Sequence, residues 1–412
     1  MPPPPLVIHN ARIVTPYRIL PHGYILIEDG RITAVQEGNP DAPDPAQADD
    51  ASGAAHPDGA VTYLDACGAY ASPGFIDLHV HGGAGFYFMD GTPDAFRAIA
   101  ALHARHGTTS MTPTTLSATK EELEATLNAY EIVKHDGGFL GMHLEGPYFA
   151  LSQRGAQDPR FIRNPNPTEY EDLITRYPSI RRWSAAPELP GALAFGEYLR
   201  KKGVLPALAH TDAVYEEVLE AYNKGYTHAT HLYSAMSGVH RKGTTRYAGA
   251  IESAFLLEDM TVEIIADGIH LPPPLLRLVY KIKGPDRTAL ITDAMRAAGM
   301  PPGKSVLGSL QHGLTVLVED GVAKLPDRSA FAGSVATADR LVRNMVTLAE
   351  VPLTEAVQMM TSTPASIMGV EDSKGSLVPG KDADIVIFDE QIRIAYTLKG
   401  GRIVYDAAKD IP

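Results

Sequence analysis

The middle of the chain repeats one pattern eight times: a short apolar run followed, in most repeats, by a longer stretch of helical periodicity. The runs cover residues 74–81, 108–114, 138–146, 181–188, 204–210, 226–232, 261–268 and 288–294. Apolar residues recur three and four apart in the intervening stretches, of which the clearest are 93–107, 120–135, 214–225 and 273–284. Eight alternating strands and helices predict an α/β fold, a parallel (β/α)8 TIM-type barrel. A doubly wound open sheet is the alternative.

Both ends of the chain are rich in short β-branched segments. Asp29-Gly30 and Gly400-Gly401 lie between such segments and predict two hairpin turns. We expect a small β-sandwich domain formed from both termini, with residues 1–73 as its first part and 371–412 as its second. Residues 74–370 then form the barrel.

Two other features of the chain concern its surface and its surroundings. The stretch from Asn39 to Gly59 is rich in Ala, Asp and Pro and predicts an excursion on the surface. The formal charge of −13 opposes binding to nucleic acid. Cys67 is the one cysteine, and the sequence shows no apolar run long enough for a membrane and no export signal at its start. We therefore expect a cytoplasmic protein without membrane or nucleic-acid partners.

Polar side chains that can bind metal ions fall at or near the carboxyl ends of the predicted strands. They are His79, His81, Glu145, His210, His231 and Asp293. Barrels of this type build their active sites at that end, whereas an open sheet would not bring all of these strand ends together. This distribution favours the barrel.

The residue types at these strand ends are those of a divalent-metal site. His79 and His81 are two apart on a strand, so both imidazoles point the same way and can grip one ion. Nitrogen and oxygen donors suit one or two transition ions, Zn2+ first, with Fe2+, Mn2+ or Co2+ also compatible. A divalent ion activates water as a nucleophile. Asp293 is placed to act as the catalytic base and then as the acid.

Two further histidines lie close to these candidates in the sequence. His228 is three residues before His231 and should face away from it on a strand, and His240 falls in a loop. We interpret both as structural or peripheral. No lysine near residues 184–188 could form a carboxylated metal bridge, which disfavours the dihydroorotase type of site.

Seven short motifs resemble the signatures of the N-acetylglucosamine-6-phosphate deacetylase family of the amidohydrolase superfamily. They are PGFIDLHVHGGAG, GMHLEGPY, LAHTDAVYEE, THLYSAM, IIADGIH, ITDAMRAAG and FAGS, and the likeness extends to KGSLVPGKDADIVIFD. The resemblance implies a metal-dependent barrel with a β-sandwich made from both termini. It implies that Glu145, His210 and His231 hold the principal ion, and that His79 and His81, helped by Asp293, can hold a second.

The resemblance also implies a set of substrate-binding positions, two of which depart from the family pattern. Gln157 stands where relatives carry a histidine that holds the substrate carbonyl, and Ser234, before Ala235, stands where relatives carry a phosphate-binding asparagine. The remaining candidates form a basic cluster suited to phosphate, namely Arg241, Lys242 and Arg246 with His270. In the family one such basic residue reaches across from a neighbouring subunit, which implies a homodimer.

The expected activity is metal-dependent hydrolysis of the acetamide of N-acetylglucosamine 6-phosphate, a small-molecule substrate of amino-sugar catabolism. One alternative keeps the chemistry and changes the substrate to N-acetylgalactosamine 6-phosphate or to an unphosphorylated or differently acylated amino sugar. A second alternative is a homologue that binds metal and sugar with little turnover, because Gln157 and Ser234 replace the usual groups.

Overall fold

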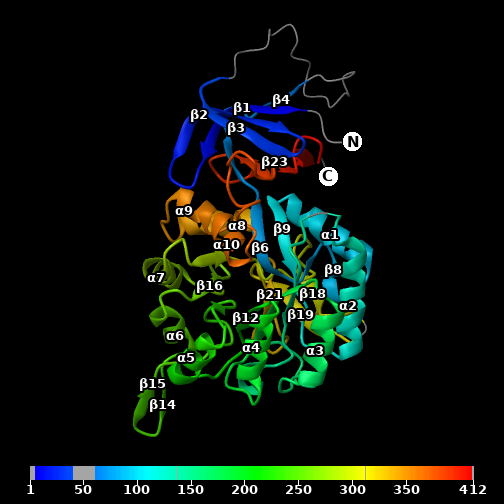
Figure 1. The fold of residues 1–412 in the computed structure, drawn as a ribbon, viewed down its shortest axis with the longest axis vertical. Coiled ribbons are helices and arrows are strands. Elements are labelled where there is room, and N and C mark those ends of the chain that lie inside the picture. Colours follow the sequence, from blue (N-terminus) through cyan, green and yellow to red (C-terminus); the bar gives the residue numbers. More distant parts are fainter. Residues whose placement is uncertain (1–4, 40–60, 137, 311, 411–412) are drawn as a thin grey trace.

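The structure, a computed structural model, describes residues 5–39, 61–136, 138–310 and 312–410. A β-rich unit that contains both ends of the described chain lies against one end of a larger α/β body (Figure 1). Most of the expected surface excursion, residues 40–60, lies outside the described residues. No helix in the part of the chain that the structure describes is long and apolar enough to cross a membrane.

The larger body is a ring of eight parallel strands that coincide with the eight predicted runs. The strands are β6 (Phe75–Val80), β9 (Thr108–Pro113), β10 (Met142–Glu145), β11 (Ile180–Ala185), β12 (Leu205–Leu208), β13 (His228–Ala229), β16 (Thr261–Ile264) and β17 (Thr288–Leu290). Six of them form one sheet in the order β10-β11-β12-β13-β16-β17, and β6 pairs with β9. Parallel bridges from Thr114 to His143 and from Val80 to Ala294 close the ring. The TIM-barrel prediction is confirmed.

Helices surround this ring, and the first of them begin at residues whose side chains cap the helix. They are α1 (Pro93–Ala104), α2 (Lys120–Val133), α3 (Pro167–Arg176), α4 (Ala192–Lys201), α5 (Tyr215–Asn223), α6 (Ala250–Leu256), α7 (Pro273–Lys283), α8 (Ala338–Thr347), α9 (Leu353–Gln358) and α10 (Ser362–Ile367). The Thr92 side chain accepts from the Ala95 N–H at the start of α1, and Thr119 and Glu122 form a capping box at the start of α2. The four stretches of clearest periodicity are all helical.

The two ends of the chain share one eight-stranded sheet (Figure 1). Its strands are β1 (Leu6–Val14), β2 (Ile19–Glu28), β3 (Arg31–Glu37), β4 (Thr62–Asp65), β5 (Tyr70–Pro73), β22 (Ile385–Phe388), β23 (Ile394–Lys399) and β24 (Arg402–Asp406). Both hairpin turns are confirmed: Asp29-Gly30 joins β2 to β3 and Gly400-Gly401 joins β23 to β24, all with positive φ. Strand β22 pairs with β5, which joins the distant ends, and the sheet has a core of its own.

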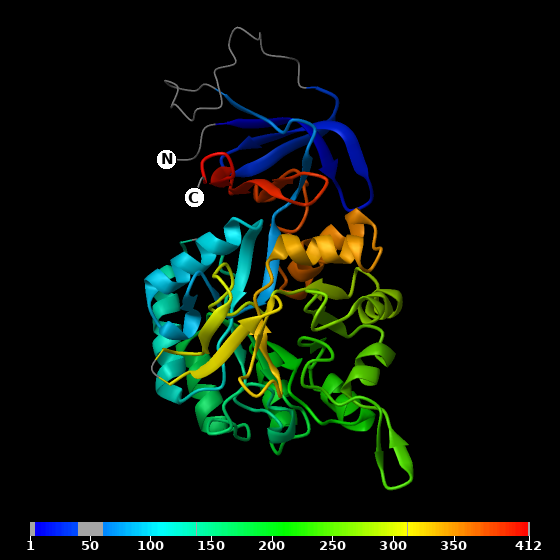
Figure 2. The same ribbon diagram turned by 180° about the vertical axis from the view of Figure 1, so that it is seen from behind.

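Two elements interrupt the barrel pattern and were not predicted. A four-stranded antiparallel sheet, with β18 (Gly303–Leu307), β19 (Leu314–Glu319), β20 (Val322–Lys324) and β21 (Phe331–Ser334), follows β17. A hairpin of β14 (His240–Lys242) and β15 (Thr245–Tyr247) projects from the body as an arm, visible from both sides (Figures 1 and 2). The shorter elements are β7 (Gly82–Gly83), β8 (Phe86–Tyr87), η2 (Phe88–Asp90) and η3 (Leu151–Gln153).

One buried histidine ties helix α1 to the loop that follows β6. The His103 side chain is fully buried, and its Nε2 hydrogen bonds to the Gly82 carbonyl oxygen over 3.0 Å. Burial lowers the pKa of His103 to about 4, and the neighbouring His106 acts in the same direction. Because the folded state binds this proton more weakly than the unfolded chain does, stability is lost as the pH falls from 6.5 towards 4.

We predict that His103→Gln makes the protein less sensitive to acid. The amide can still donate to the Gly82 carbonyl oxygen but has no proton to gain. Between pH 7 and pH 5 the free energy of unfolding should fall by about 2 kcal/mol less in the variant than in the parent protein. Urea unfolding at the two pH values measures the difference, and an equal fall in both proteins would contradict the role of His103.

Candidate active site

The six polar side chains predicted from the sequence meet at the carboxyl end of the barrel. His79 lies within β6, Glu145 ends β10, and His81 directly follows β6. His210 and His231 each come two residues after a strand, and Asp293 comes three residues after β17. The backbone at these last three residues has positive φ, of 49°, 31° and 47°. Such strain in non-glycine residues is typical of functional sites, and here it turns the side chains inward.

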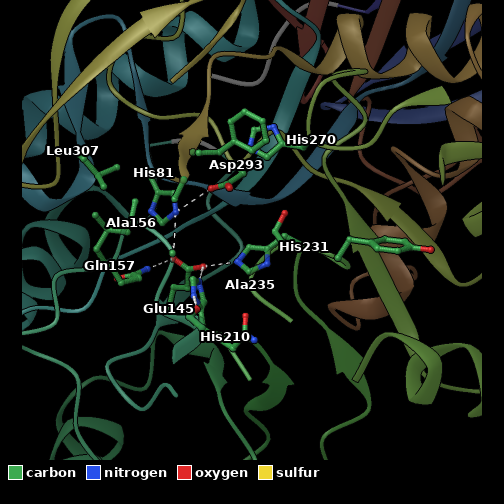
Figure 3. A pocket seen from close by; sticks show the side chains of 18 of the residues that line it. His81, Glu145, Ala156, Gln157, His210, His231, Ala235, His270, Asp293 and Leu307 are labelled. Atoms are coloured by element: carbon green, nitrogen blue, oxygen red, sulfur yellow. Dashed lines mark hydrogen bonds and ion pairs between the residues drawn. The ribbon is translucent and has the colours of Figure 1, made fainter. Parts of the chain in front are cut away.

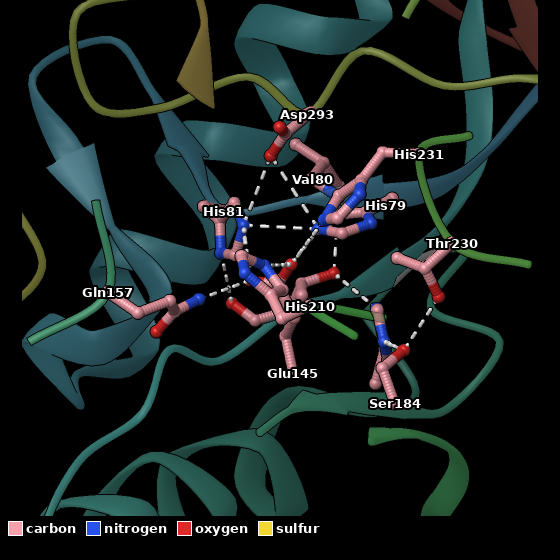
Figure 4. A network of polar contacts seen from close by, with 12 residues as sticks. His79, Val80, His81, Glu145, Gln157, Ser184, His210, Thr230, His231 and Asp293 are labelled. Atoms are coloured by element: carbon pink, nitrogen blue, oxygen red, sulfur yellow. Dashed lines mark hydrogen bonds and ion pairs between the residues drawn. The ribbon is translucent and has the colours of Figure 1, made fainter. Parts of the chain in front are cut away.

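The six residues form two adjoining groups of three (Figure 4). Their members are Glu145, His210 and His231 in one and His79, His81 and Asp293 in the other, and within each group the donor atoms lie within 4.8 Å of one another.

In the first group, Glu145 Oε1 lies 2.8 Å from His231 Nε2 and 3.3 Å from His210 Nε2. In the second group, Asp293 Oδ1 lies 3.2 Å from His81 Nε2 and 3.6 Å from His79 Nε2. The two groups are adjacent to each other, since His79 Nε2 of the second group lies 3.6 Å from Glu145 Oε1 of the first.

The two carboxylates make this end of the barrel favourable for positive charge. Burial alone would raise the pKa of Glu145, but His79 and the hydrogen bonds from His210 and His231 outweigh it and hold the pKa well below its usual value. Burial would lower the pKa of His231, yet its hydrogen bond to Glu145 and the charge of Glu145 raise that pKa to about 8. The same field that favours imidazolium here favours a divalent cation.

Three of the four histidines present Nε2 to the site because another group takes Nδ1. His210 Nδ1 lies 2.8 Å from the Gln153 carbonyl oxygen, and His81 Nδ1 lies 3.2 Å from the Thr114 carbonyl oxygen. His79 Nδ1 lies 2.9 Å from Glu263 Oε1. All three acceptors lack a hydrogen, so each Nδ1 carries one, and in the neutral ring, the form that binds a metal, Nε2 presents its lone pair to the site. The arrangement suits metal coordination through Nε2.

A cavity of about 430 Å³ opens over the two groups (Figure 3). Five of the six donors line it, the exception being the fully buried His79. The predicted substrate-binding residues Gln157, Ser234, Ala235 and His270 line it as well. Its volume suits a small molecule of the size of a sugar phosphate.

Both the oxygen and the nitrogen of the Gln157 side-chain amide form hydrogen bonds. Its Oε1 accepts from the Ser117 N–H over 2.8 Å, and its Nε2 donates to Glu145 Oε2 over 2.8 Å. His270 is held in a similar way: Asp267 Oδ2 lies 2.7 Å from its Nδ1, which leaves Nε2 for a ligand in the cavity. Each side chain thus enters the cavity with a fixed orientation.

Of the basic cluster only His270 reaches this cavity, and its three cationic side chains do not. Arg241 and Lys242 lie on β14 and Arg246 on β15, all exposed on the projecting arm. Among the described residues, the side chains that line the cavity include no lysine and no arginine. His240 also lies on the arm, and His228 lies below the site, 3.1 Å from Glu263 Oε2.

Several cavity and support residues were missed by reasoning from the sequence. Leu307 and Phe331 line the cavity from the unpredicted β18–β21 sheet. Arg182 and Glu263, which support the site from below, stand within the apolar runs of two predicted strands. A charged residue inside such a run was the available signal, because a charge in a barrel interior needs a partner.

Comparison with known proteins agrees with the motifs and the geometry. A chain from Vibrio furnissii, an N-acetylglucosamine-6-phosphate deacetylase, is 36% identical over 82% of this chain and 83% of its own. A chain from Escherichia coli O157:H7, an N-acetylgalactosamine-6-phosphate deacetylase, is 36% identical over 78% of this chain and 84% of its own.

A solved structure is similar over almost the whole chain. It is an N-acetyl-D-glucosamine-6-phosphate deacetylase variant from Mycobacterium smegmatis in complex with N-acetyl-D-glucosamine-6-phosphate, with a TM-score of 0.86 and 31% identity over 98% of this chain and all of that one. The model of the amidohydrolase family matches residues 70–404. With a barrel of that type and relatives of this extent, the chain belongs to the amidohydrolase family.

Proposed function

We propose that the protein hydrolyses the N-acetyl group of N-acetylglucosamine 6-phosphate and releases acetate and glucosamine 6-phosphate in amino-sugar catabolism. The observation that carries the proposal is the meeting of two metal-type donor groups, one of which includes the acid–base candidate Asp293, in one cavity of suitable size. The relatives from Vibrio furnissii and Mycobacterium smegmatis support the choice of substrate.

The donor set fits divalent cations. Each group combines imidazole nitrogens with a carboxylate oxygen, which is the mixture that Zn2+ accepts, and Glu145 raises the pKa of His231 to about 8 against the effect of burial. We assign the first ion to Glu145, His210 and His231 and a second to the other three residues. A bound divalent ion, Zn2+ by preference, supplies a Lewis acid that polarises the amide carbonyl and lowers the pKa of the attacking water.

Asp293 moves the proton in this proposal. Its carboxylate lines the cavity, and His81 and His79 hold its pKa below the usual value although burial alone would raise it. It is therefore ionised and can take a proton from the attacking water. The same proton goes to the substrate nitrogen as the C–N bond breaks, because an amide anion is a poor leaving group.

The remaining cavity residues orient the sugar. Gln157 and His270 enter the cavity with fixed orientations, and Ser234 and Ala235 line it nearby. We assign His270 Nε2 to the sugar or its phosphate, since its Nδ1 is already held by Asp267. Gln157 is assigned to the acetyl end because it touches Glu145.

A homodimer would complete the phosphate site. A dianionic phosphate needs cationic donors, and no lysine or arginine among the described residues lines the cavity. The exposed arm carries Arg241, Lys242 and Arg246 away from the body (Figure 2). We propose that the arm of one subunit brings at least one of these residues to the cavity of its partner.

We propose that the chain folds into two domains, one of which is built from both ends of the sequence. The pairing of β5 with β22 and the separate apolar core support a β-sandwich domain made of residues 1–73 and 371–412. Residues 74–370 then form the metal-dependent barrel.

We predict acetate release from N-acetylglucosamine 6-phosphate, with kcat/KM about 100-fold lower for the unphosphorylated sugar, since two charge-assisted hydrogen bonds contribute about 3 kcal/mol. A panel that also contains N-acetylgalactosamine 6-phosphate and other acyl groups tests this prediction. As a control, a chelator should abolish release and Zn2+ should restore it. No release from any phosphorylated sugar would overturn the proposal and leave an unphosphorylated amino sugar as the substrate, or the poorly active homologue.

Asp293→Asn should lower kcat at least about 100-fold, because general acid–base catalysis contributes about 10²–10⁴. Steady-state kinetics should show a KM that changes much less than kcat. The matched control is Asp158→Asn, since Asp158 lies next to Gln157 in the chain but pairs with Arg160 and does not line the cavity. A variant at Asp293 that kept most of the parent kcat would place the base elsewhere.

Mixing two inactive variants tests the arm. Asp293→Asn keeps a normal arm, and the triple variant of Arg241, Lys242 and Arg246 to Ala keeps a normal base. If the arm acts on the partner, each mixed dimer regains one complete site of its two. After the subunits of an equal mixture have exchanged, about half of the dimers are mixed, so about a quarter of the parent activity should return. An arm that served its own chain would give no recovery.

A further inference from the structure

A fully buried ion pair lies directly below the two donor groups. Arg182 of β11 and Glu263 of β16 both have no exposed surface, and the contact is bidentate, with Arg182 Nη1 2.6 Å from Glu263 Oε2 and Nη2 2.8 Å from Oε1. Arg182 also donates to the Leu78 carbonyl oxygen over 3.1 Å and to Thr230 Oγ1 over 2.8 Å. The guanidinium is therefore fixed by three elements of the barrel.

Glu263 also contacts His79, one of the predicted metal ligands. Its Oε1 lies 2.9 Å from His79 Nδ1 and accepts a longer contact, 3.3 Å, from the His231 N–H. Because both of its oxygens accept from the Arg182 guanidinium, Glu263 is a carboxylate that can only accept, so the hydrogen of the neutral His79 ring is on Nδ1.

The consequence for His79 is a fixed ring with a lone pair on Nε2. That atom lies 3.2 Å from His81 Nε2 and 3.6 Å from Asp293 Oδ1, so it faces the second donor group. In the opposite tautomer Nδ1 would present a lone pair to a carboxylate, and Nε2 would present a hydrogen to the place of the ion. Glu263 excludes that tautomer.

We propose that Glu263, fixed by Arg182, is a positioning residue that sets the tautomer and orientation of His79 and thereby the affinity of the His79–His81–Asp293 group for a divalent ion. This inference rests on the proposed function, which requires ions at the site. The first donor group depends on Glu263 much less, because its only contact with that side chain is the backbone N–H of His231.

Titration of the metal-free protein with Zn2+ against a competing chelator tests the proposal, with bound metal counted by elemental analysis. The parent protein should bind two ions. In Glu263→Gln the affinity for one ion should fall about 10- to 100-fold, the usual effect of losing such a partner, while the other should stay within about three-fold. Absorption of bound Co2+ gives a second readout that does not depend on turnover.

Two further variants separate positioning from general damage. His228→Gln is the matched control, because His228 contacts the other oxygen of Glu263 and belongs to neither donor group, so it should still bind two ions with parent affinities. Arg182→Met with Glu263→Leu removes both buried charges together, which is often neutral for stability, and should weaken the same single ion. Circular dichroism during thermal unfolding checks that each variant is folded.

The possible results distinguish this inference from the proposed function. A parent protein that binds no divalent ion contradicts the proposed function. If the parent binds two ions and a folded Glu263 variant binds both with parent affinities, or loses both equally, only the positioning role is overturned. Histidine ¹⁵N shifts of the metal-free parent provide a test without any variant: His79 protonated on Nε2 would overturn the role of Glu263.

Discussion

The buried pair of Arg182 and Glu263 is the interaction on which the site depends. A parallel barrel has an apolar interior, and a charge placed there must be matched and hydrogen bonded at once. This pair meets the requirement with a bidentate contact. Glu263 also accepts from His79 and from the His231 N–H, and Arg182 also donates to the Leu78 carbonyl oxygen and to Thr230 Oγ1. The metal-type donors thus rest on a polar network rather than directly on the apolar core.

The donors come from five strands, β6, β10, β12, β13 and β17, and they converge only because the barrel closes. The Val80–Ala294 bridge brings the end of β6 beside the end of β17, and Asp77 adds hydrogen bonds to both strands by accepting from the His79 N–H and the Thr292 hydroxyl. By contrast, the terminal sheet has its own apolar core and contributes no residue that lines the cavity among those described. The site is a property of the barrel and of the β18–β21 sheet that covers it.

The elements found from the sequence are those whose signal is local. Apolar runs bounded by helical periodicity gave all eight barrel strands, and Asp29-Gly30 and Gly400-Gly401 gave both hairpins, because positive φ is a property of the residues at the turn. The β18–β21 sheet was not predicted because it interrupts the repeat. Arg182 and Glu263 were not identified as a pair because each is a single charged residue inside an apolar run. The two residues are partners of each other but lie 81 residues apart in the chain, a separation at which no periodicity of the sequence indicates a contact.

By itself the sequence determined which side chains could bind metal and at which end of the barrel they would lie, since both follow from residue type and from position after an apolar run. The tertiary structure alone decided which nitrogen of His79 faces the site, that both ends of the Gln157 amide form hydrogen bonds, and that the basic arm contributes no residue to the cavity of its own chain. These properties depend on the direction of side chains and on contacts between distant strands, and the spacing of residues along the chain determines neither the directions nor the contacts.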